Sequence, residues 1–498
     1  MKLSLIIDEL KRCSCLIETI NFKEIEIEKA VYDSKNIIGG ELFVCIKGFV
    51  TDGHLYINEA KKNGAIAFII SEESKEIPIL PTLRVRDTRK ALAIISDIIL
   101  DHPSQKINLI GVTGTNGKTS TTILINNILS LAGHKTGLVG TICNKIGDKK
   151  IHSEHTTPES SDLLELFAQM VKEKVDYATM EVSSHALALQ RVESVEFDIA
   201  VFTNLSQDHL DFHTDMDAYL KEKLKLFINL GRGEKCRNKY AILNYDDLVY
   251  EKIISQITTK HYSYGFDASA DFRAINWEIH LNGASFDLIH PKGQMHINLL
   301  LSGKFSIYNA LAACAVALLE GIDEKYIIQA LATSTVPGRF EPVKGVDNFA
   351  IIVDYAHTPD GLENILASAK SITKNRVITV FGCGGDRDKK KRPMMAEKAA
   401  IYSDYIIVTS DNPRTENPEK IIDDIIPGFH ARNFSKFERI VDRKNAIEKA
   451  IKLAEDGDIL VIAGKGHEDY QIIGKTKIPF SDIDVSESFL AERRKYND

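Results

Sequence analysis

A short glycine-rich loop between an apolar segment and a helix-like segment is the part of this sequence best suited to chemistry. Residues 111–119 read Gly-Val-Thr-Gly-Thr-Asn-Gly-Lys-Thr and follow the apolar stretch 107–112. Backbone N–H groups of such a loop, with the N-terminus of the following helix, stabilise phosphate oxygens, and the lysine adds positive charge. The Thr119 hydroxyl is suited to bind Mg²⁺. The loop predicts a nucleoside triphosphate site, although Val112 stands where the full phosphate-loop spacing has glycine.

Two more polar residues stand directly after or at the end of predicted strands. Glu181 lies at the end of the predicted strand 177–182, and His209 follows the predicted strand 197–203. Ligands of open α/β sheets bind at the carboxyl ends of the strands, so both side chains are candidate metal or substrate ligands. The alternatives are a solvated glutamate at a strand end and a hydrogen-bonded histidine with no ligand, since Mg²⁺ prefers oxygen to nitrogen.

The elements that must position these residues form three predicted α/β domains, 1–103, 104–336 and 337–498. The Asp-His-Pro-Ser break at 101–104 and the Pro-Gly-Arg turn at 337–339 separate them. In the first, 41–46 and 65–70 are strand-like, and a helix ends at Asn63-Gly64. In the second, strands and helices alternate after the loop, which favours a mostly parallel, doubly wound sheet. In the third, we expect strands at 350–353, 376–381, 405–408 and 459–463.

Composition narrows the class of protein. The chain of 498 residues is 44% apolar, with a formal net charge of −8 and a pI near 6.1, so it lacks the basic character of a nucleic-acid or membrane-surface binder. Seven scattered cysteines without metal-ligand spacing suit a reducing cytoplasm. Early charges exclude a signal peptide, and the apolar run 310–319 is too short to span a bilayer. We expect a cytoplasmic protein that is a monomer, binding no nucleic acid and entering no membrane.

The loop also resembles the ATP loop of the Mur ligase family, and further short stretches match that family in order along the whole chain. These stretches are Asp-Ser-Lys at 33–35, Asp-Gly-His at 52–54, His-Thr-Thr-Pro-Glu-Ser at 155–160, Glu-Val-Ser-Ser-His at 181–185, Asp-His-Leu-Asp at 208–211, Gly-Arg-Phe-Glu at 338–341, Asp-Tyr-Ala-His at 354–357 and Gly-Cys-Gly-Gly-Asp-Arg at 382–387. The resemblance implies an N-terminal UDP-binding domain, a central phosphate-loop ATPase domain and a C-terminal Rossmann-like domain that brings the amino acid.

The activity that the resemblance implies is ATP-dependent amide formation. The γ-phosphoryl group of ATP passes to a carboxylate, and an amine attacks the resulting acyl phosphate. Two anions must meet, so lysines and Mg²⁺ that offset their repulsion should supply most of the rate. The implied catalytic residues are Lys118, Glu181, His209 and Lys223. The implied ligands of Mg²⁺ are Thr119, Glu181, His209 and Lys223, the last as a carbamate.

Lys223 follows Tyr219 by one helical turn and precedes Leu226 and Phe227, a spacing that matches the family's carbamylated lysine. Carbamylation reverses the sign of the group, because an ammonium repels Mg²⁺ whereas a carbamate offers it two oxygens. The alternative for this residue, and for its neighbours Lys221 and Lys225, is a solvated helix lysine.

By the same resemblance, two substrates are assigned contacts. The ATP contacts are Gly114, Thr115, Asn116, Gly117, Lys118, Thr119, Ser120, Asn309, Arg339, Asp354 and His357. The contacts of a UDP-linked substrate are Ser34, Thr156, Thr157, Ser183, Gln190 and Arg191. For Arg339 a salt bridge at the domain boundary is the alternative.

The residues Asp-Asn-Pro-Arg at 411–414 concern the amino acid that is added, since in diaminopimelate-adding members they contact the distal end of this substrate. Diaminopimelate carries one more carboxylate than lysine, and an arginine binds a carboxylate through two parallel hydrogen bonds. The implied contacts are Arg387, Asp411, Asn412, Pro413, Arg414, Gly464 and Glu468. An Asn-Pro turn without a binding role is the alternative.

The function expected from the resemblance is ligation of meso-2,6-diaminopimelate to the D-glutamate of UDP-N-acetylmuramoyl-L-alanyl-D-glutamate through an acyl phosphate, in peptidoglycan precursor synthesis. The nearest alternative is the same ligase using L-lysine, which Arg414 disfavours. A folylpolyglutamate-type synthetase is disfavoured by the N-terminal domain. From another class, a phosphate-loop switch protein would bind nucleotide without ligating anything.

Overall fold

The computed structural model describes residues 1–49, 51–346 and 348–497. The chain folds into two compact units, each built from segments that are separate in the sequence. The first comprises Met1–Thr113, His134–Ala200 and Glu222–Tyr240, and the second comprises Gly114–Gly133, Val201–Lys221 and Ala241–Asp498.

The first unit begins with a five-stranded sheet in the order β1-β5-β4-β3-β2. Its elements are α1 (Leu3–Arg12), β1 (Leu16–Ile20), β2 (Ala30–Val31), β3 (Leu42–Val44), α2 (Ile57–Asn63), β4 (Ala67–Ser71), β5 (Thr82–Val85) and α3 (Thr88–Ile99). Alternate residues of β3 and β4 enter different cores. Leu42 and Ile69 pack with α1 and α3, whereas Phe43 and Phe68 pack against α2. Helices therefore cover both faces, and β3 and β4 fall on the runs 41–46 and 65–70 that were predicted as strands.

The middle of the chain carries the phosphate loop. Its elements are β6 (Asn108–Thr113), α4 (Lys118–Leu131), β7 (Thr136–Val139), β8 (Asn144–Ile146), β9 (Lys149–Ile151), α5 (Ser160–Lys172), β10 (Tyr177–Glu181), α6 (Ser184–Ala188), β11 (Ile199–Phe202), α7 (Met216–Leu230), β12 (Tyr240–Asn244), α8 (Tyr250–Ile254), β13 (Lys260–Gly265), β14 (Phe272–His280), β15 (Gly283–His290), β16 (Gly293–Leu299), α9 (Lys304–Leu319) and α10 (Glu324–Thr333).

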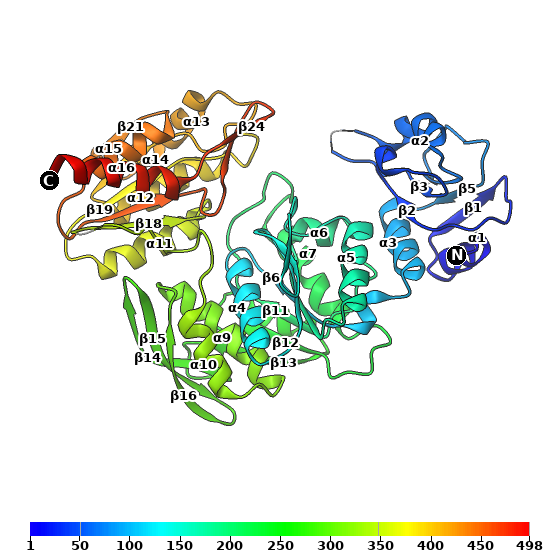
Figure 1. Ribbon diagram of the computed structural model, residues 1–498, viewed down its shortest axis with the longest axis horizontal. Coiled ribbons are helices and arrows are strands. Elements are labelled where there is room, and N and C mark those ends of the chain that lie inside the picture. The colour runs from blue at the N-terminus through cyan, green and yellow to red at the C-terminus, as the bar shows by residue number, and fades with distance from the viewer. Residues whose placement is uncertain (50, 347, 498) are drawn as a thin grey trace. The chain divides into compact units, whose positions relative to one another are not determined.

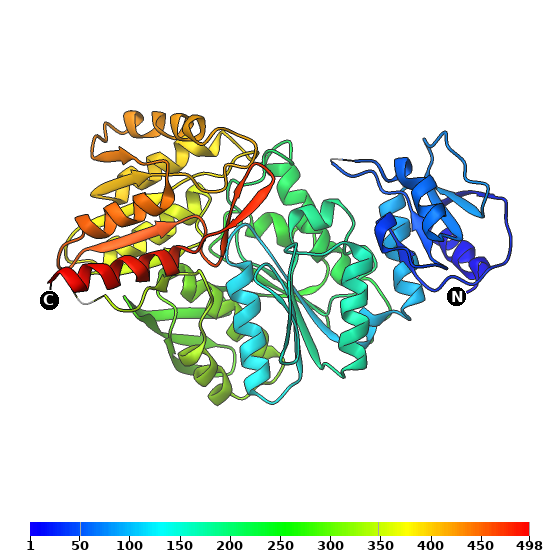
Figure 2. The same ribbon diagram turned by 45° about the horizontal axis from the view of Figure 1, so that its top comes forward.

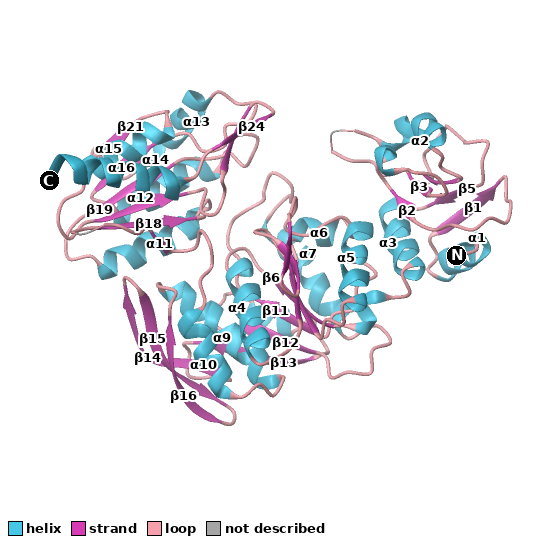
Figure 3. Cartoon of the chain, viewed as in Figure 1, coloured by secondary structure: helices cyan, strands magenta, loops and turns pink. Residues whose placement is uncertain are grey.

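The strands in this middle part are mixed in direction. In the first unit β10 pairs parallel with β6 and β7, but β8 and β9 add antiparallel neighbours. In the second unit β14, β15 and β16 form an antiparallel meander, drawn as long arrows in Figure 3. The expectation of a mostly parallel sheet missed this meander, because its tight turns and alternating polar residues do not follow the strand-helix alternation on which the expectation rested.

The third sheet has the order β17-β18-β22-β19-β20-β21. Its region contains β17 (Glu341–Pro342), β18 (Ala350–Asp354), α11 (Pro359–Ile372), β19 (Val377–Phe381), α12 (Lys391–Tyr402), β20 (Tyr405–Val408), α13 (Pro418–Ile425), α14 (Pro427–Ala431), β21 (Phe437–Arg439), α15 (Arg443–Leu453), β22 (Ile459–Ala463), β23 (Tyr470–Ile473), β24 (Thr476–Pro479) and α16 (Asp482–Asn497). The pairings of β22 with β18 and β19, and of β20 with β19 and β21, are parallel, as the four predicted strands required.

Helices lie on both faces of this third sheet (Figures 1 and 2). Ile352 and Val461 pack in a core with α11 to α14, whereas their neighbours Ile351 and Ile462 pack in a second core with α15 and α16. The two-residue period of a strand explains this alternation. The result is the doubly wound, Rossmann-like arrangement that was predicted, with the carboxyl ends of β19, β20 and β22 side by side.

A buried ion pair joins α15 to the start of α16. Both Arg443 and Asp482 have fully buried side chains, and the guanidinium donates two hydrogen bonds of 2.8 Å to the carboxylate. Arg443 also donates to the carbonyl of Ala463 at 3.0 Å, at the end of β22. The pair therefore links the last helix to the strand end that precedes Gly464.

We expect Asp482→Asn to destabilise the C-terminal region, because removing one partner leaves the other charge buried without compensation. Breaking such a pair typically costs about 3–5 kcal/mol, which corresponds to a fall in melting temperature of roughly 10 °C. Differential scanning calorimetry measures it. The control is Glu448→Gln, which makes the same chemical change at the surface pair of Glu448 with Lys452 in the same helix α15. An equal fall in both variants would contradict the role given to the buried pair.

Candidate functional site

The phosphate loop has a backbone that only glycine accommodates at two positions. Gly114 has φ +146°, and a Cβ there would lie 1.8 Å from Oγ1 of Thr203. Gly117 has φ +84°, and its Cβ would lie 2.4 Å from Oδ1 of Asn309. Asn204 completes the support, because its carbonyl accepts from the Thr115 N–H at 2.8 Å. The loop is thus fixed by neighbours in the second unit before any phosphate binds.

Lys118 begins α4, and its side chain folds back over the loop. Its Nζ donates to the carbonyl oxygens of Gly114 at 2.9 Å and Thr115 at 2.7 Å. The ammonium therefore lies over the loop at the helix N-terminus, where helix dipole and lysine charge both favour an anion. This geometry supports the predicted phosphate site.

A hollow of about 360 Å³ adjoins the loop within the second unit. Six predicted ATP contacts line it, namely Asn116, Gly117, Ser120, Asn309, Arg339 and Asp354. The other five, Gly114, Thr115, Lys118, Thr119 and His357, are absent from its lining, although the first four belong to the loop and its helix. The hollow also contains Asp360, which sequence reasoning missed. Its carboxylate accepts from Nδ2 of Asn116 at 2.7 Å and from the Ser206 hydroxyl at 3.3 Å, so it connects α11 to the loop.

Arg339 is aimed at the loop by the turn that holds it. The buried Asp354 carboxylate accepts from the N–H groups of Phe340 and Ala356, both at 2.7 Å. The Arg339 guanidinium lies 4.7 Å from the ring centre of Tyr355 and donates to the Thr119 hydroxyl at 3.4 Å. Among the described residues Arg339 has no ion pair with a carboxylate, which disfavours a boundary salt bridge.

His209 and His357 lie near one buried carboxylate. Nε2 of His209 is 3.3 Å from Asp208, whose other oxygen is 3.7 Å from Nζ of Lys391. Burial raises the pKa of Asp208, but the charges of Lys391 and His209 outweigh it and lower that pKa well below its usual range. Burial, aided by the charge of Lys391, lowers the pKa of His357 to about 4, so His357 is neutral at pH 7.

Two residues that line the hollow beside the phosphate loop, Tyr308 and Lys304, also contact aromatic rings outside its lining. Tyr308 lines it and donates to Asp246 at 2.8 Å. Its ring contacts Phe266, which in turn contacts Trp277, with ring centres 4.8 and 5.7 Å apart. Nζ of Lys304, another lining residue, lies 4.6 Å from the centre of Phe266 and 5.6 Å from that of Trp277. This arrangement offers π surfaces and a cation beyond the phosphate loop.

In the first unit, predicted substrate contacts gather at the end of β10. The buried Glu181 accepts from N–H and hydroxyl of Thr141, at 2.7 and 3.1 Å. Thr141 also shares a hydrogen bond of 3.0 Å with Thr156. The Thr157 hydroxyl donates to the Glu181 carbonyl at 2.8 Å and accepts from the N–H of Ser183 at 3.1 Å. A compact set of oxygen-bearing side chains results.

Arginines lie beside this set and converge on Glu159. Arg191 donates to the carbonyl of Thr157 at 2.9 Å, and its Nε is 3.4 Å from Glu159. Arg89 of α3, not identified from sequence, contacts the same carboxylate at 2.6 Å. Gln190 donates to Asp87. Ser34 lies apart from these contacts, buried and donating to Glu59 at 3.1 Å.

The first unit also contains a smaller hollow of about 280 Å³ near these residues. Tyr32, His152, His155 and Asp162 line it, and Tyr32 donates to Asp162 at 2.8 Å. The hollow brings Tyr32, the residue before Asp33-Ser34, close to His155, the residue before Thr156. This proximity was not evident from sequence, since the two segments are more than a hundred residues apart.

The three lysines of α7 differ in burial. Lys223 has 1% of its surface exposed, whereas Lys221 is exposed and Lys225 forms a surface pair with Glu222. A buried lysine is unusual unless it is paired or modified. The solvated alternative is therefore wrong for Lys223. Among the described residues no cluster of three or more His, Cys, Asp or Glu side chains forms a metal site.

The predicted amino-acid contacts lie at the carboxyl ends of β19, β20 and β22. Nδ2 of Asn412 donates to Glu468 at 2.9 Å. The buried Lys465 donates to both, to Oδ1 of Asn412 at 3.1 Å and to Glu468 at 3.0 Å. Gly464 has φ +119°, and a Cβ there would be 2.5 Å from the Asp411 carboxylate.

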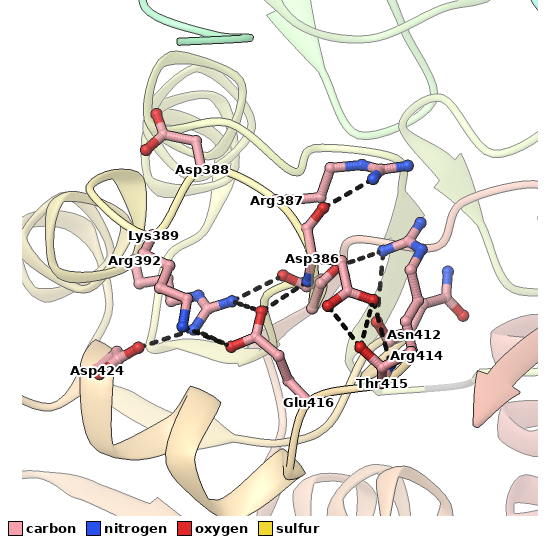
Figure 4. Close-up of polar contacts among 12 residues, drawn as sticks. Asp386, Arg387, Asp388, Lys389, Arg392, Asn412, Arg414, Thr415, Glu416 and Asp424 are labelled. Atoms are coloured by element: carbon pink, nitrogen blue, oxygen red, sulfur yellow. Dashed lines mark hydrogen bonds and ion pairs between the residues drawn. The ribbon is translucent and has the colours of Figure 1, made fainter. Parts of the chain in front are cut away.

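Arg387 and Arg414 supply positive charge to the same region (Figure 4). Arg414 donates to the carbonyl of Gly385 at 2.9 Å, and Arg387 to that of Asp386 at 2.8 Å. Burial and the charge of Arg387 lower the pKa of Arg414. The carbonyl of Pro413 packs against Gly385, where a Cβ would be 1.9 Å away. Two guanidiniums near one carboxylate and one amide suit a ligand with both acidic and amino groups.

Sequence reasoning did not assign roles to Lys465, Arg392, Glu416, Arg89 or Asp360. Lys465 directly follows the predicted contact Gly464, and Asp360 lies three residues after the Asp-Tyr-Ala-His stretch at 354–357, so proximity to these residues could have suggested both. Arg89, Arg392 and Glu416 look like ordinary surface charges in the sequence. In the structure Arg89 pairs with Glu159, and Arg392 pairs with Glu416 at 2.8 Å.

These features, a phosphate loop in an α/β fold and charged side chains at the ends of parallel strands, are those of a nucleotide-binding protein with a second site suited to a substrate that carries acidic and amino groups. Sequence models of three Mur ligase domains match the chain. The Mur ligase family catalytic domain matches residues 26–98, the Mur ligase middle domain 112–317, and the Mur ligase glutamate ligase domain 338–466.

Comparison with individual proteins gives the same family. UDP-N-acetylmuramoyl-L-alanyl-D-glutamate–2,6-diaminopimelate ligases of Syntrophomonas wolfei and Clostridium botulinum are 48% and 47% identical, each over 94% of this chain and 96% of the relative. A solved structure of such a ligase has a TM-score of 0.65 at 31% identity, covering 94% of this chain and 95% of that one. MurF ligase from Thermotoga maritima in complex with ADP shares the fold, with a TM-score of 0.66 at 18% identity, over 93% of this chain and 98% of that one.

The chain therefore belongs to the Mur ligase family, whose members use ATP. The resemblance and the three-domain α/β fold expected from sequence are confirmed. No helix in the described part of the chain is long and apolar enough to cross a membrane.

We expect Gly114→Ala to weaken nucleotide binding, because its Cβ would displace Thr203, whose hydroxyl donates to the Asn116 carbonyl at 2.6 Å. The dissociation constant of ADP, measured calorimetrically, should rise about tenfold or more, the loss of one to two hydrogen bonds. Gly133→Ala is the control. Gly133 also has positive φ, at the end of α4, but nothing lies within 4 Å of its Cβ position. That variant should lose some stability and keep its affinity. Wild-type affinity in Gly114→Ala would show that the loop tolerates the clash.

Proposed function

We propose that this chain ligates meso-2,6-diaminopimelate to the D-glutamate of UDP-N-acetylmuramoyl-L-alanyl-D-glutamate. The observation that carries the proposal is the pair of guanidiniums, Arg387 and Arg414, beside the Asn412–Glu468 pair at the ends of three parallel strands. Arginines suit a carboxylate, while the oxygens of Glu468 and Asn412 suit an ammonium. The names of the relatives support the same substrates.

The proposed reaction is the one that the family resemblance implies. The γ-phosphoryl group of ATP passes to the glutamate carboxylate, giving an acyl phosphate and ADP. The amine of the diamino acid then attacks the acyl carbon, the C–O bond to phosphate breaks, and the amine loses a proton. Lys118 and Arg339 hold positive charge at the phosphate loop, where negative charge accumulates during phosphoryl transfer.

Mg²⁺ suits the residues proposed to hold it. Thr119 offers a hydroxyl, Glu181 a carboxylate, and Lys223 as a carbamate two oxygens, all of which are hard ligands, while His209 offers a nitrogen. Mg²⁺ held by such ligands would supply positive charge that offsets the charge of the phosphates. Neighbouring residues position two of these ligands: Thr141 orients Glu181 through two hydrogen bonds, and Asp208 contacts His209.

Substrate binding is proposed for one further set of residues. The residues proposed to contact the UDP-linked substrate are Thr156, Thr157, Ser183, Gln190, Arg191 and Ser34.

We place the reaction in the cytoplasm, in keeping with seven cysteines that are all free thiols. The domain boundaries near residues 103 and 336 stay predictions.

We expect Lys223→Ala to be nearly inactive and to regain part of its activity in millimolar acetate or formate, whose oxygens can replace those of the carbamate. Activity is measured as ADP release with all substrates present. Lys221→Ala, which alters an exposed lysine of the same helix, should keep wild-type activity without any added carboxylate. Full activity of Lys223→Ala would remove the carbamate from the mechanism.

The test of the whole proposal is ADP release with the UDP-dipeptide and either diaminopimelate or L-lysine. Release should require both the dipeptide and the diamino acid, and kcat/KM should favour diaminopimelate. A switch protein would hydrolyse ATP regardless of either substrate. Wild-type preference for lysine would reverse the specificity and leave the ligase reaction in place.

In the same assay, Arg414→Ala should lower kcat/KM for diaminopimelate by roughly two orders of magnitude, because breaking a charged hydrogen-bonded pair typically costs about 2–5 kcal/mol. The KM for ATP should change little. The matched control is Arg439→Ala, which removes an exposed arginine paired with Glu419 and Asp423 in the same region. If Arg414→Ala leaves the preference for diaminopimelate over lysine unchanged, Arg414 does not determine it.

A further inference from the structure

The two loops that carry Arg387 and Arg414 are joined backbone to backbone. The Gly385 N–H donates to the carbonyl of Asn412 at 2.9 Å, and Arg414 returns a bond to the Gly385 carbonyl. Arg414 has φ +51°, a conformation that side chains other than glycine adopt at a cost in free energy. The position of its guanidinium therefore depends on how firmly these loops are held.

Two carboxylates hold the loops by reciprocal hydrogen bonds (Figure 4). Glu416 accepts from the N–H of Asp386 at 2.6 Å. The Asp386 carboxylate accepts in return from Thr415, from the hydroxyl at 2.8 Å and from the N–H at 3.2 Å. We call Asp386, Thr415 and Glu416 the clasp. Its residues flank the two arginines in the chain: Asp386 directly precedes Arg387, and Thr415 and Glu416 directly follow Arg414.

The clasp is anchored by a buried arginine. Arg392 is fully buried and donates to Glu416 at 2.8 and 3.1 Å and to the carbonyl of Gly384 at 3.3 Å. Its other carboxylate partner is Asp424, at 2.7 Å. The hydrogen bond from Arg392 lowers the pKa of Glu416 to about 2, so the carboxylate stays ionised throughout the neutral range.

Holding Arg387 and Arg414 close together costs electrostatic free energy, because both side chains are positively charged. Arg387 is exposed and Arg414 is partly buried, and the charge of Arg387 disfavours the charged form of Arg414. Without rigid loops the two side chains would separate into solvent. A bound carboxylate offsets the repulsion, so loops that hold the arginines together favour an anion over a neutral group.

We propose that Glu416 and Asp386 are positioning residues, which hold Arg387 and Arg414 together for the second carboxylate of the diamino acid. This inference rests on the proposed function. The clasp touches no substrate itself; it acts through the two arginines. It predicts that loss of the clasp lowers discrimination in favour of the dicarboxylic substrate more than it lowers turnover.

The experiment compares Glu416→Ala with Asp424→Ala. Both variants remove a carboxylate from Arg392, but only Glu416 accepts from the Asp386 N–H. Steady-state ADP release is measured with diaminopimelate and with L-lysine. For Glu416→Ala, kcat/KM for diaminopimelate should fall about tenfold or more, the loss of a charge-assisted hydrogen bond. The fall should come from KM, with the lysine value and the KM for ATP within about twofold of wild type. Asp424→Ala should stay within about twofold throughout.

Two milder variants keep the test informative if Glu416→Ala unfolds. Glu416→Gln retains an acceptor for the Asp386 N–H and should recover most of the affinity for diaminopimelate. Thr415→Val preserves shape at an exposed position but removes the hydroxyl that donates to Asp386; KM for diaminopimelate should rise about threefold.

The outcomes separate the two proposals. An unchanged ratio of the two kcat/KM values in Glu416→Ala and Thr415→Val, or equal losses in Asp424→Ala and Glu416→Ala, would overturn the positioning role. A wild type that does not prefer diaminopimelate would instead overturn the proposed substrate, and that result is read before any variant is compared.

Discussion

Carboxylates that hold cations in place are the constraint on which the sites of this protein depend. Each substrate carries negative charge, so each site needs cations, and cations near one another repel. Glu159 holds Arg89 and Arg191, Glu416 holds Arg392 and Lys389, and Asp208 lies between Lys391 and His209. Because charged groups lose hydration when buried, each of these carboxylates offsets a cost that would otherwise push the cations into solvent.

The backbone of the phosphate loop is also held in place by neighbouring side chains. Gly114 and Gly117 adopt conformations that bring main chain against Thr203 and Asn309, and Asp360 binds the loop side chain Asn116. Asp360 and Arg339 both come from the C-terminal part of the second unit, which also carries the amino-acid contacts. Both residues therefore link the phosphate loop to the part of the chain that also carries Arg414. They give the phosphate loop and the amino-acid loops a common support.

Much of this organisation could be predicted from the sequence. Short apolar runs such as 405–408 and 459–463 were interpreted correctly as buried strands, since their length and lack of polar residues leave few alternatives. The phosphate loop was recognised because its glycines and lysine lie within a few residues of one another in the chain. The meander β14–β16 was missed, since half-buried antiparallel strands have a weaker pattern. Pairings such as Glu416 with Arg392 could not be predicted, because a charge that looks solvated becomes structural only when distant elements fold together.

Lys223 of α7 shows what the sequence can predict and what only the structure can. Spacing singled out Lys223 among three similar residues, and burial then distinguished it from Lys221 and Lys225. Ser34 shows the opposite case, since a residue selected by motif lies buried and bonded to Glu59. Motif position therefore indicates a neighbourhood, and burial and partners decide which side chain in it can meet a ligand.

Trp277 gives the molecule an optical property of its own. It is the only tryptophan among 498 residues, 43% exposed, and its indole lies 5.6 Å from the ammonium of Lys304, which lines the hollow beside the phosphate loop. A cation near an indole face changes the emission of the ring, so any anion that draws Lys304 away alters it. The intrinsic fluorescence of the unlabelled protein thus reports from a single known position, and rapid-mixing measurements can separate arrival of the nucleotide from the chemical steps that follow.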